Sequence, residues 1–184
     1  MKVQLVGVRL AFPDLFEAKP FEAGGPKRYS ATALIEPGSE NDKKIRAAIA
    51  EVAKEKWGKK AEANLKAYAG NSNKFCYVDG ATKDYDGFEG MWALSSHRRE
   101  IDGRVTVIGR NKEALTPADG KPYGGCYVNM LVDVWAQEGQ YPGMRCGLLG
   151  VQFVKDGDAF SGAAPASPDE FEDLGVPEED EALV

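Results

Sequence analysis

The segment "KVQLVGVRLAF", Lys2 to Phe12, decides the fold because its apolar residues alternate along the chain. Alternation divides them between two faces: Val3, Leu5 and Gly7 on one, and Val6, Val8 and Leu10 on the other. A strand that is apolar on both faces needs cover on both sides. The segment therefore predicts a strand in a closed or well-covered sheet.

Further strand-like segments follow, each bounded by residues typical of turns. The region from Phe12 to Lys27 contains three prolines and a Gly-Gly pair, and it is interpreted as a loop. The predicted strands are "KRYSATALIE" (27–36), "KFCYV" (74–78), "MWALSS" (91–96), "VTVIG" (105–109), "CYVNMLVDVWAQ" (126–137) and "RCGLLGVQFVKDG" (145–157).

A helical insertion of about residues 39–69 separates the first two strands from the rest. Ser39 is a suitable N-cap, and one apolar stripe recurs at spacings of three and four. Gly58 ends or kinks the first helix, and a shorter one follows. The stripe consists of Ile45, Ile49, Val52, Ala53 and Trp57.

The order of these elements predicts a mainly β fold with a helical insertion. Many short strands with Gly- and Pro-rich turns favour a small barrel or sandwich, and the helix between strands fits an OB-fold-like small β-barrel. We expect this domain to span residues 1–160. Residues 161–184, rich in Ala, Pro, Ser and acids, predict a flexible, disordered acidic C-terminal tail.

Charge is divided unevenly along the 184 residues, whose net charge is −6. The last base is Lys155, and ten acids follow it. The remaining 19 acids face 23 bases, so residues 1–155 carry a net charge of +4. A basic body with an acidic end points to nucleic acid or to an interaction tail.

Several classes of protein are excluded by composition. No apolar run is long enough for a membrane span, and the N-terminus lacks the features of a signal peptide, which predicts a cytoplasmic protein without a membrane partner. Cys76, Cys126 and Cys146 are interpreted as buried free thiols, with a zinc site or disulfide framework as the weaker alternative. No cofactor and no metal are expected.

Catalytic motifs are missing as well. The sequence has no phosphate-binding loop and no nucleophile elbow, and its one histidine, His97, is interpreted as a surface-loop residue. One enzymatic alternative remains open, a metal-dependent nuclease, because clustered carboxylates can bind Mg²⁺. Its acids would be Asp79, Asp84, Asp86 and Glu89, although Asp and Gly are also ordinary turn residues.

Aromatic and basic residues fall together in the β segments. Single-stranded nucleic acid needs this mixture, because bases stack on rings while Lys and Arg follow the phosphates. Trp57, Trp135 and Phe153 are assigned to the core, and Trp92 fits either place. The candidate DNA-binding residues are Lys27, Arg28, Tyr29, Tyr85, Phe88, Trp92, Arg98, Arg99, Arg104, Lys121, Tyr123, Tyr141 and Arg145.

Taken in order, several segments resemble a family of phage single-stranded DNA-binding proteins with an OB-fold. They are "VRLAFPDLFEAKPF", "YSATALIEPG", "AIAEVAKEKWG", "DYDGFEGMWALS", "GCYVNMLVDVWAQ", "LLGVQFVKDGDAFSG" and "APASPDEFEDL". The resemblance implies sequence-independent binding of single-stranded DNA in phage replication or recombination, in the cytoplasm of the infected host and without catalysis. It also implies an acidic tail, although this one ends "EALV" where such tails often end in an aromatic residue.

The tail has a candidate role of its own. A tethered polyanion can compete with DNA for a cationic groove and, once released, contact replication or recombination proteins. A solubilising tail without a partner is the alternative. RNA binding and a homodimer stay open. The tail residues proposed for this role are Asp169, Glu170, Phe171, Glu172, Asp173, Glu178, Glu179, Asp180 and Glu181.

Overall fold

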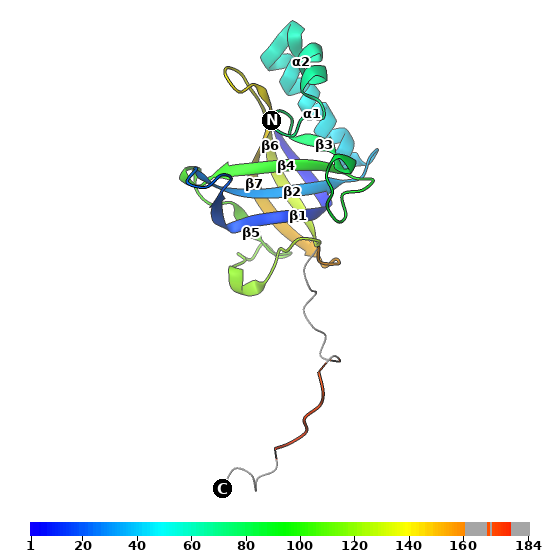
Figure 1. Cartoon of the computed structure of the whole chain (residues 1–184), viewed down its shortest axis with the longest axis vertical. Helices are drawn as coiled ribbons and strands as arrows, with labels where there is room; N and C mark the ends of the chain where they lie inside the picture. Colours follow the sequence, from blue (N-terminus) through cyan, green and yellow to red (C-terminus); the bar gives the residue numbers. More distant parts are fainter. Residues whose placement is uncertain (161–168, 170, 178–184) are drawn as a thin grey trace.

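The computed structural model describes residues 1–160, 169 and 171–177. Its seven strands form one sheet in the order β3-β4-β2-β1-β6-β7-β5, and an additional pairing joins β4 to β7. Figure 1 shows the resulting barrel, with the helices at one end. The strands are β1 (Lys2–Pro20), β2 (Lys27–Ile35), β3 (Tyr77–Asp79), β4 (Trp92–Arg99), β5 (Thr106–Ile108), β6 (Tyr127–Gln137) and β7 (Gly143–Lys155).

Five of these strands close on themselves in the ring β1-β2-β4-β7-β6. All neighbours in the ring are antiparallel except β4 and β7, which pair in parallel where His97 lies opposite Gly147. A closed five-stranded barrel of this kind is the OB-fold, so the predicted fold class is confirmed. The short strands β3 and β5 extend the sheet beside β4 and β7.

The bulge in β1 explains why its sequence looks apolar on both faces. The register of β1 against β6 shifts between Leu5 and Val8, and Gly7 adopts a φ of 65° there. A bulge shifts the alternation by one residue, so Val3 and Leu5 before it and Val8 and Leu10 after it all point into the core. The prediction of a closed sheet was correct, but the assignment of these residues to two faces was wrong.

The first strand is also longer than predicted. Two further irregularities, between Ala11 and Lys19, let β1 continue beside β2 as far as Pro20. Only residues 21–26 connect the two strands. The prolines and glycines of this region therefore mark a bent strand end as well as a loop.

The helical insertion consists of α1 (Glu40–Trp57), a short 3-10 turn η1 (Gly58–Lys60) and α2 (Ala61–Tyr68). As predicted, Ser39 caps α1, accepting a hydrogen bond from the Asp42 backbone N–H at 3.2 Å. Ile45, Ile49 and Ala53 are buried on the predicted face, which packs on β1 and β6. Neither helix of the described chain has the length and apolarity needed to cross a membrane.

The remaining short turns are η2 (Gly80–Thr82), η3 (Glu100–Asp102) and η4 (Pro117–Asp119). Beyond β7, the Phe160 backbone N–H donates to the Gly124 carbonyl at 3.0 Å, and the Arg9 guanidinium lies 4.0 Å from the Phe160 ring centroid. The chain leaves the barrel at the end opposite the helices (Figure 1). Its three cysteines are buried free thiols, as predicted.

The proposed tail is only partly described. Phe171, Leu174 and Val176 are exposed, as are Glu172 and Asp173. Glu170, Glu178, Glu179, Asp180 and Glu181 lie outside the described residues. The division into a domain of residues 1–160 and a flexible tail stays a prediction.

Candidate nucleic-acid interface

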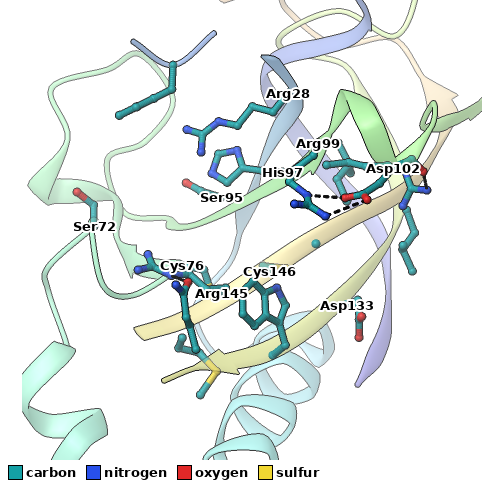
Figure 2. A pocket seen from close by; sticks show the side chains of 18 of the residues that line it. Arg28, Ser72, Cys76, Ser95, His97, Arg99, Asp102, Asp133, Arg145 and Cys146 are labelled. Carbon is teal, nitrogen blue, oxygen red and sulfur yellow. Dashed lines mark hydrogen bonds and ion pairs between the residues drawn. The ribbon is translucent and has the colours of Figure 1, made fainter. Parts of the chain in front are cut away.

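A cleft of about 970 Å³ runs across one face of the barrel. Strands β2, β4, β6 and β7 supply its floor and walls, and the loops around residues 21, 72 and 83 border it (Figure 2). In OB-folds the second and third barrel strands, with the loops between strands one and two and between four and five, bind oligonucleotides. Here those strands are β2 and β4, so the cleft occupies the corresponding face.

Cations outnumber carboxylates in the cleft. Its lining contains Arg28, Lys83, Arg98, Arg99 and Arg145 against two acids, Asp102 and Asp133. Asp102 is paired with Arg99 at 2.8 Å, and Asp133 with the N-terminal amine of Met1 at 2.8 Å. The Arg99 hydrogen bond holds the pKa of Asp102 below its usual value. Both carboxylates are therefore already engaged.

The other four basic side chains of the cleft form no ion pair within the part of the chain that the structure describes. Arg98 and Arg145 are instead held by uncharged oxygens. Arg98 donates to the carbonyls of Asp102 and Gly103, and Arg145 donates to the Asn73 carbonyl. Such bonds orient a guanidinium without neutralising it, so these groups can bind an anion.

Two aromatic rings lie in the same cleft with a large part of their surface in solvent. Trp135 on β6 is 45% exposed, and Phe21 in the loop between β1 and β2 is 73% exposed. The Phe21 ring lies 4.5 Å from the Arg28 guanidinium carbon. Rings beside unpaired cations are the elements that hold unpaired bases and their phosphates.

His97 lies in β4, and its side chain faces the cleft (Figure 2). Burial, together with the charges of Arg28 and Arg145, lowers its pKa to about 4. The imidazole is therefore neutral at neutral pH. The prediction of a surface-loop histidine was wrong, because β4 continues to Arg99.

Comparison with known proteins identifies the family. The model of the family described as Enterobacter phage Enc34, ssDNA-binding protein, matches residues 1–183. Protein p50 of Acyrthosiphon pisum secondary endosymbiont phage 1 is 44% identical, over 100% of this chain and 99% of that protein. The chain belongs to the Enc34 ssDNA-binding protein family.

Solved structures agree with this assignment. The Enc34 family is represented by the single-stranded DNA-binding protein from bacteriophage Enc34 in complex with ssDNA, which is 27% identical. It superposes with a TM-score of 0.71 over 87% of this chain and 89% of that one. Bacteriophage T7 gp2.5, a single-stranded DNA-binding protein, is 15% identical with a TM-score of 0.52 over 97% of this chain and 100% of that one, a similarity of fold alone.

The structure brings together part of the site predicted for this family member. Arg28, Arg98, Arg99 and Arg145 line the cleft. They come from β2, β4 and β7, which are distant in sequence and adjacent in the barrel. The prediction that cations from these segments share one surface is consistent with this arrangement, and their contact with DNA stays a proposal.

Tyr29 and Phe88 do not face the cleft. Tyr29 is 5% exposed and Phe88 3% exposed, and both pack in the hydrophobic core. Side chains alternate along a strand, so Arg28 and Tyr29, which are consecutive on β2, cannot share a face. Buried rings cannot stack on a base, and the assignment of these two residues to the DNA surface was wrong.

Three other candidates make contacts within the protein. Trp92 lies beside Tyr77 and under the Arg46 guanidinium at 4.4 Å. The Tyr123 hydroxyl donates to Asp156 at 2.7 Å, and Lys121 lies 4.9 Å from the Phe153 ring centroid. None of the three is among the residues that line the cleft. The structure gives each of them a packing role.

The remaining candidates are exposed but lie outside the cleft lining. Tyr85 packs edge-on against Phe12 at 4.8 Å, and Tyr141, in the turn between β6 and β7, accepts a hydrogen bond on its backbone carbonyl from Arg145. Lys27 and Arg104 are exposed. A role for these four residues in DNA binding stays a prediction.

Among the basic, aromatic and histidine side chains of the cleft, the prediction missed Phe21, Lys83, His97 and Trp135. For Trp135 the signal was present, because Val128, Met130, Val132 and Val134 are buried and alternate with it along β6. That alternation places Trp135 on the outer face with Asp133. Its assignment to the core was wrong. Phe21 and Lys83 lie in loops, where no periodicity indicates direction.

The acids of the nuclease alternative do not form a metal site. Asp79 accepts a hydrogen bond from the Ala81 backbone N–H at 2.9 Å and caps η2, which is a turn role. Among the described residues, no three His, Cys, Asp or Glu side chains are placed to hold a metal ion. With the family identified as single-stranded DNA-binding proteins, the nuclease alternative is not supported.

Proposed function

We propose that this chain binds single-stranded DNA in the cleft, without catalysis and without preference for base sequence. The observation that carries the proposal is one cleft that combines four cations with the exposed ring of Trp135. The cations form no ion pair among the described residues, and they are Arg28, Lys83, Arg98 and Arg145. Phosphates would contact the cations and bases would stack on the rings. Both interactions are available to any nucleotide, since every nucleotide has a base with a π-face and a phosphate.

The test is a titration of fluorescently labelled oligo-dT, a mixed-sequence oligonucleotide and a duplex, each with and without Mg²⁺. We expect similar affinity for both single strands, weaker affinity for the duplex, quenching of tryptophan fluorescence, and no cleavage. Affinity should fall steeply with salt, as counterion release requires. Absence of a complex at low salt would contradict the proposal, and Mg²⁺-dependent cleavage would restore the nuclease alternative. A matched RNA oligonucleotide tests the RNA binding that the sequence left open.

We further propose that the acidic tail competes with DNA for the cleft. The cleft has four basic side chains without an ion pair among the described residues, and ten acids follow Lys155. Deletion of residues 165–184 should strengthen binding of single-stranded DNA, mostly at low salt. The matched control keeps the length and replaces the acids of this segment by Asn and Gln, which should have the same effect. Equal affinity of all three proteins at every salt concentration would contradict the competition between the tail and DNA.

The released tail would offer exposed Phe171, Leu174 and Val176 to replication or recombination proteins in the cytoplasm of the infected host. Pull-down with the full chain, with and without bound oligo-dT, tests this, since more partner should be captured when DNA is present. Light scattering of the same samples determines whether the protein is a homodimer.

A further inference from the structure

Three nitrogen-bearing side chains from three strands gather in one part of the cleft. Arg28 comes from β2, His97 from β4 and Arg145 from β7 (Figure 2). His97 lies opposite Ser30 on β2 and opposite Gly147 on β7, so its strand is held between the two arginine-bearing strands. The barrel closure therefore creates this group, which no single segment contains.

Arg28 has no counter-charge within the part of the chain that the structure describes. Its guanidinium makes no ion pair and no hydrogen bond with the described residues, and its contact is with the face of the Phe21 ring. Burial lowers the pKa of this guanidinium. A partly desolvated cation without a partner is unfavourable, and an incoming anion would relieve that cost.

Arg145 is held in place without being neutralised. Its guanidinium donates to the Gln137 side-chain oxygen at 3.3 Å, the Asn73 carbonyl at 2.5 Å and the Tyr141 carbonyl at 3.3 Å. These acceptors from two loops and β6 are uncharged. They fix the direction of the fork that would meet a phosphate.

His97 lies on the strand between the two arginine-bearing strands, and unlike the arginines it is neutral at neutral pH. Its Nδ1 is buried and has no hydrogen-bond partner among the described residues. Both arginines repel a proton on its ring. A neutral imidazole with an unused nitrogen, beside two cations, is poised to become charged once an anion offsets them.

The other titratable groups of the cleft do not supply that anion. Asp102 is paired with Arg99 and Asp133 with the Met1 amine. Cys146 is hydrogen-bonded to Cys76 and buried, which raises its pKa and keeps the thiol neutral. Lys83 and Arg98 add positive charge to the cleft.

We infer that Arg28, His97 and Arg145 form a subsite for one phosphodiester group of the bound strand, and that His97 takes up a proton from solvent more readily when the subsite is filled. The inference rests on the proposed function, because the phosphodiester belongs to the single-stranded DNA. A protein that gains a proton on binding must bind more tightly as the pH falls. Binding of the strand is therefore coupled to pH through His97.

The first test uses NMR, since His97 is the only histidine in the chain. The imidazole signals are titrated with pH in the full chain, free and saturated with oligo-dT, in a buffer without phosphate or sulfate. The pKa of His97 should rise by about one unit or more on binding, the size expected when an opposite charge reaches a buried group. Saturation by oligo-dT with an unchanged pKa would overturn the subsite and leave the proposed function intact. Absence of binding would overturn both.

The second test compares the wild type with His97→Gln, which keeps a hydrogen-bonding side chain that does not titrate. Affinity for oligo-dT of the wild type should rise about twofold or more between about pH 7.5 and about pH 5, and the variant should lose most of that gain. Thymine has no group that titrates in this range, and the tail is the same in both proteins. An equal gain in both proteins would contradict the role of His97.

The third test uses the variant Arg28→Gln, which removes the arginine that has no charged partner among the described residues. In the free protein the pKa of His97 should rise, because one of its two repelling cations is gone. The further rise on binding oligo-dT should shrink. If the pKa of His97 is the same in Arg28→Gln as in the wild type, both free and bound to oligo-dT, Arg28 is not part of the subsite.

Discussion

Two arginines of this protein lie against aromatic rings, and their surroundings give them opposite roles. Arg46 on α1 covers Trp92 at 4.4 Å and donates to the buried carboxylate of Asp42 at 2.7 Å. Arg28 on β2 covers Phe21 at a similar distance but has no carboxylate partner among the described residues. Both arginines contact an aromatic ring, but among the described residues only Arg46 of the two has a carboxylate as its counter-charge.

The comparison shows how to separate a structural cation from one available to a ligand. Asp42 is 6% exposed and also accepts hydrogen bonds from the Tyr77 hydroxyl at 2.7 Å and the Gly38 backbone N–H at 2.9 Å. Burial pushes the pKa of this carboxyl up, but the three donors outweigh it and the pKa is lowered. The charge of Arg46 is thus consumed inside the protein, whereas the charge of Arg28 faces an open cleft.

The largest expected effect is on the stability provided by the cluster of Asp42, Arg46 and Tyr77. Asp42→Ala leaves the buried Tyr77 hydroxyl and the Arg46 guanidinium without their acceptor, so the free energy of unfolding should fall by about 3 kcal/mol. Urea denaturation measures it. The matched control is Glu40→Ala, the same charge change at an exposed position of the same helix, which should change little. Equal stability of the two variants would mean that the cluster is not structural.

The next largest effect is on the affinity for DNA, through Arg28 in the cleft. Arg28→Glu should weaken binding of oligo-dT about a hundredfold at low salt, because it replaces a phosphate contact by repulsion, while the melting temperature hardly changes. Lys27→Glu makes the same charge change on the adjacent residue of β2, outside the cleft lining. It should weaken binding far less. If the two variants bind alike, overall charge rather than the cleft governs affinity.

A smaller effect separates the two tryptophans. Trp135→Ala should weaken binding of oligo-dT about tenfold with little loss of stability, since stacking on one ring contributes about 1–3 kcal/mol. Trp92→Ala should instead lower the melting temperature and leave the affinity of the folded protein unchanged. Fluorescence anisotropy and thermal denaturation of both variants provide the measurements. The reverse pattern would exchange the roles of the two rings.

The smallest effect is on acid stability. The pKa of His97 is about 4 in the folded protein, below the 6.5 usual for histidine, so the unfolded chain binds the proton more readily. Stability that depends on neutral His97 is present above about pH 6.5 and is lost as the pH falls toward 4. Between about pH 7.5 and about pH 5.5, His97→Gln should lose on the order of 1 kcal/mol less than the wild type. Parallel stability curves for the two proteins would show that the imidazole is not held neutral.

Most of the fold could be predicted from local patterns. The strand segments, the cap at Ser39 and the stripe through Ile45 and Ile49 repeat at periods set by backbone geometry. The errors lie where the period is interrupted. The bulge at Gly7 shifts the phase of β1, and the region after Phe12 continues as strand because β2 pairs with it.

The site was less accessible to prediction. The prediction grouped three residues because they are neighbours in sequence: Lys27, Arg28 and Tyr29. Consecutive strand residues point to opposite faces, so this grouping placed a core tyrosine on the DNA surface. The same rule, applied to β6, would have placed Trp135 outside. Phe21 and Lys83 offered no such rule, because loop directions depend on what the loop packs against.

The sequence alone determined the class of protein: a mainly β body of net positive charge, an acidic end and a family resemblance that comparison confirmed. Only the tertiary structure decided which cations are available, because availability depends on partners far away in the chain. Asp42 neutralises Arg46 within one helix, while the pairing of β4 with β7 brings Arg28, His97 and Arg145 together, and no described carboxylate forms an ion pair with any of the three. Each residue type brings its own charge, but the fold decides which opposite charges lie beside it and therefore whether that charge is available to a ligand.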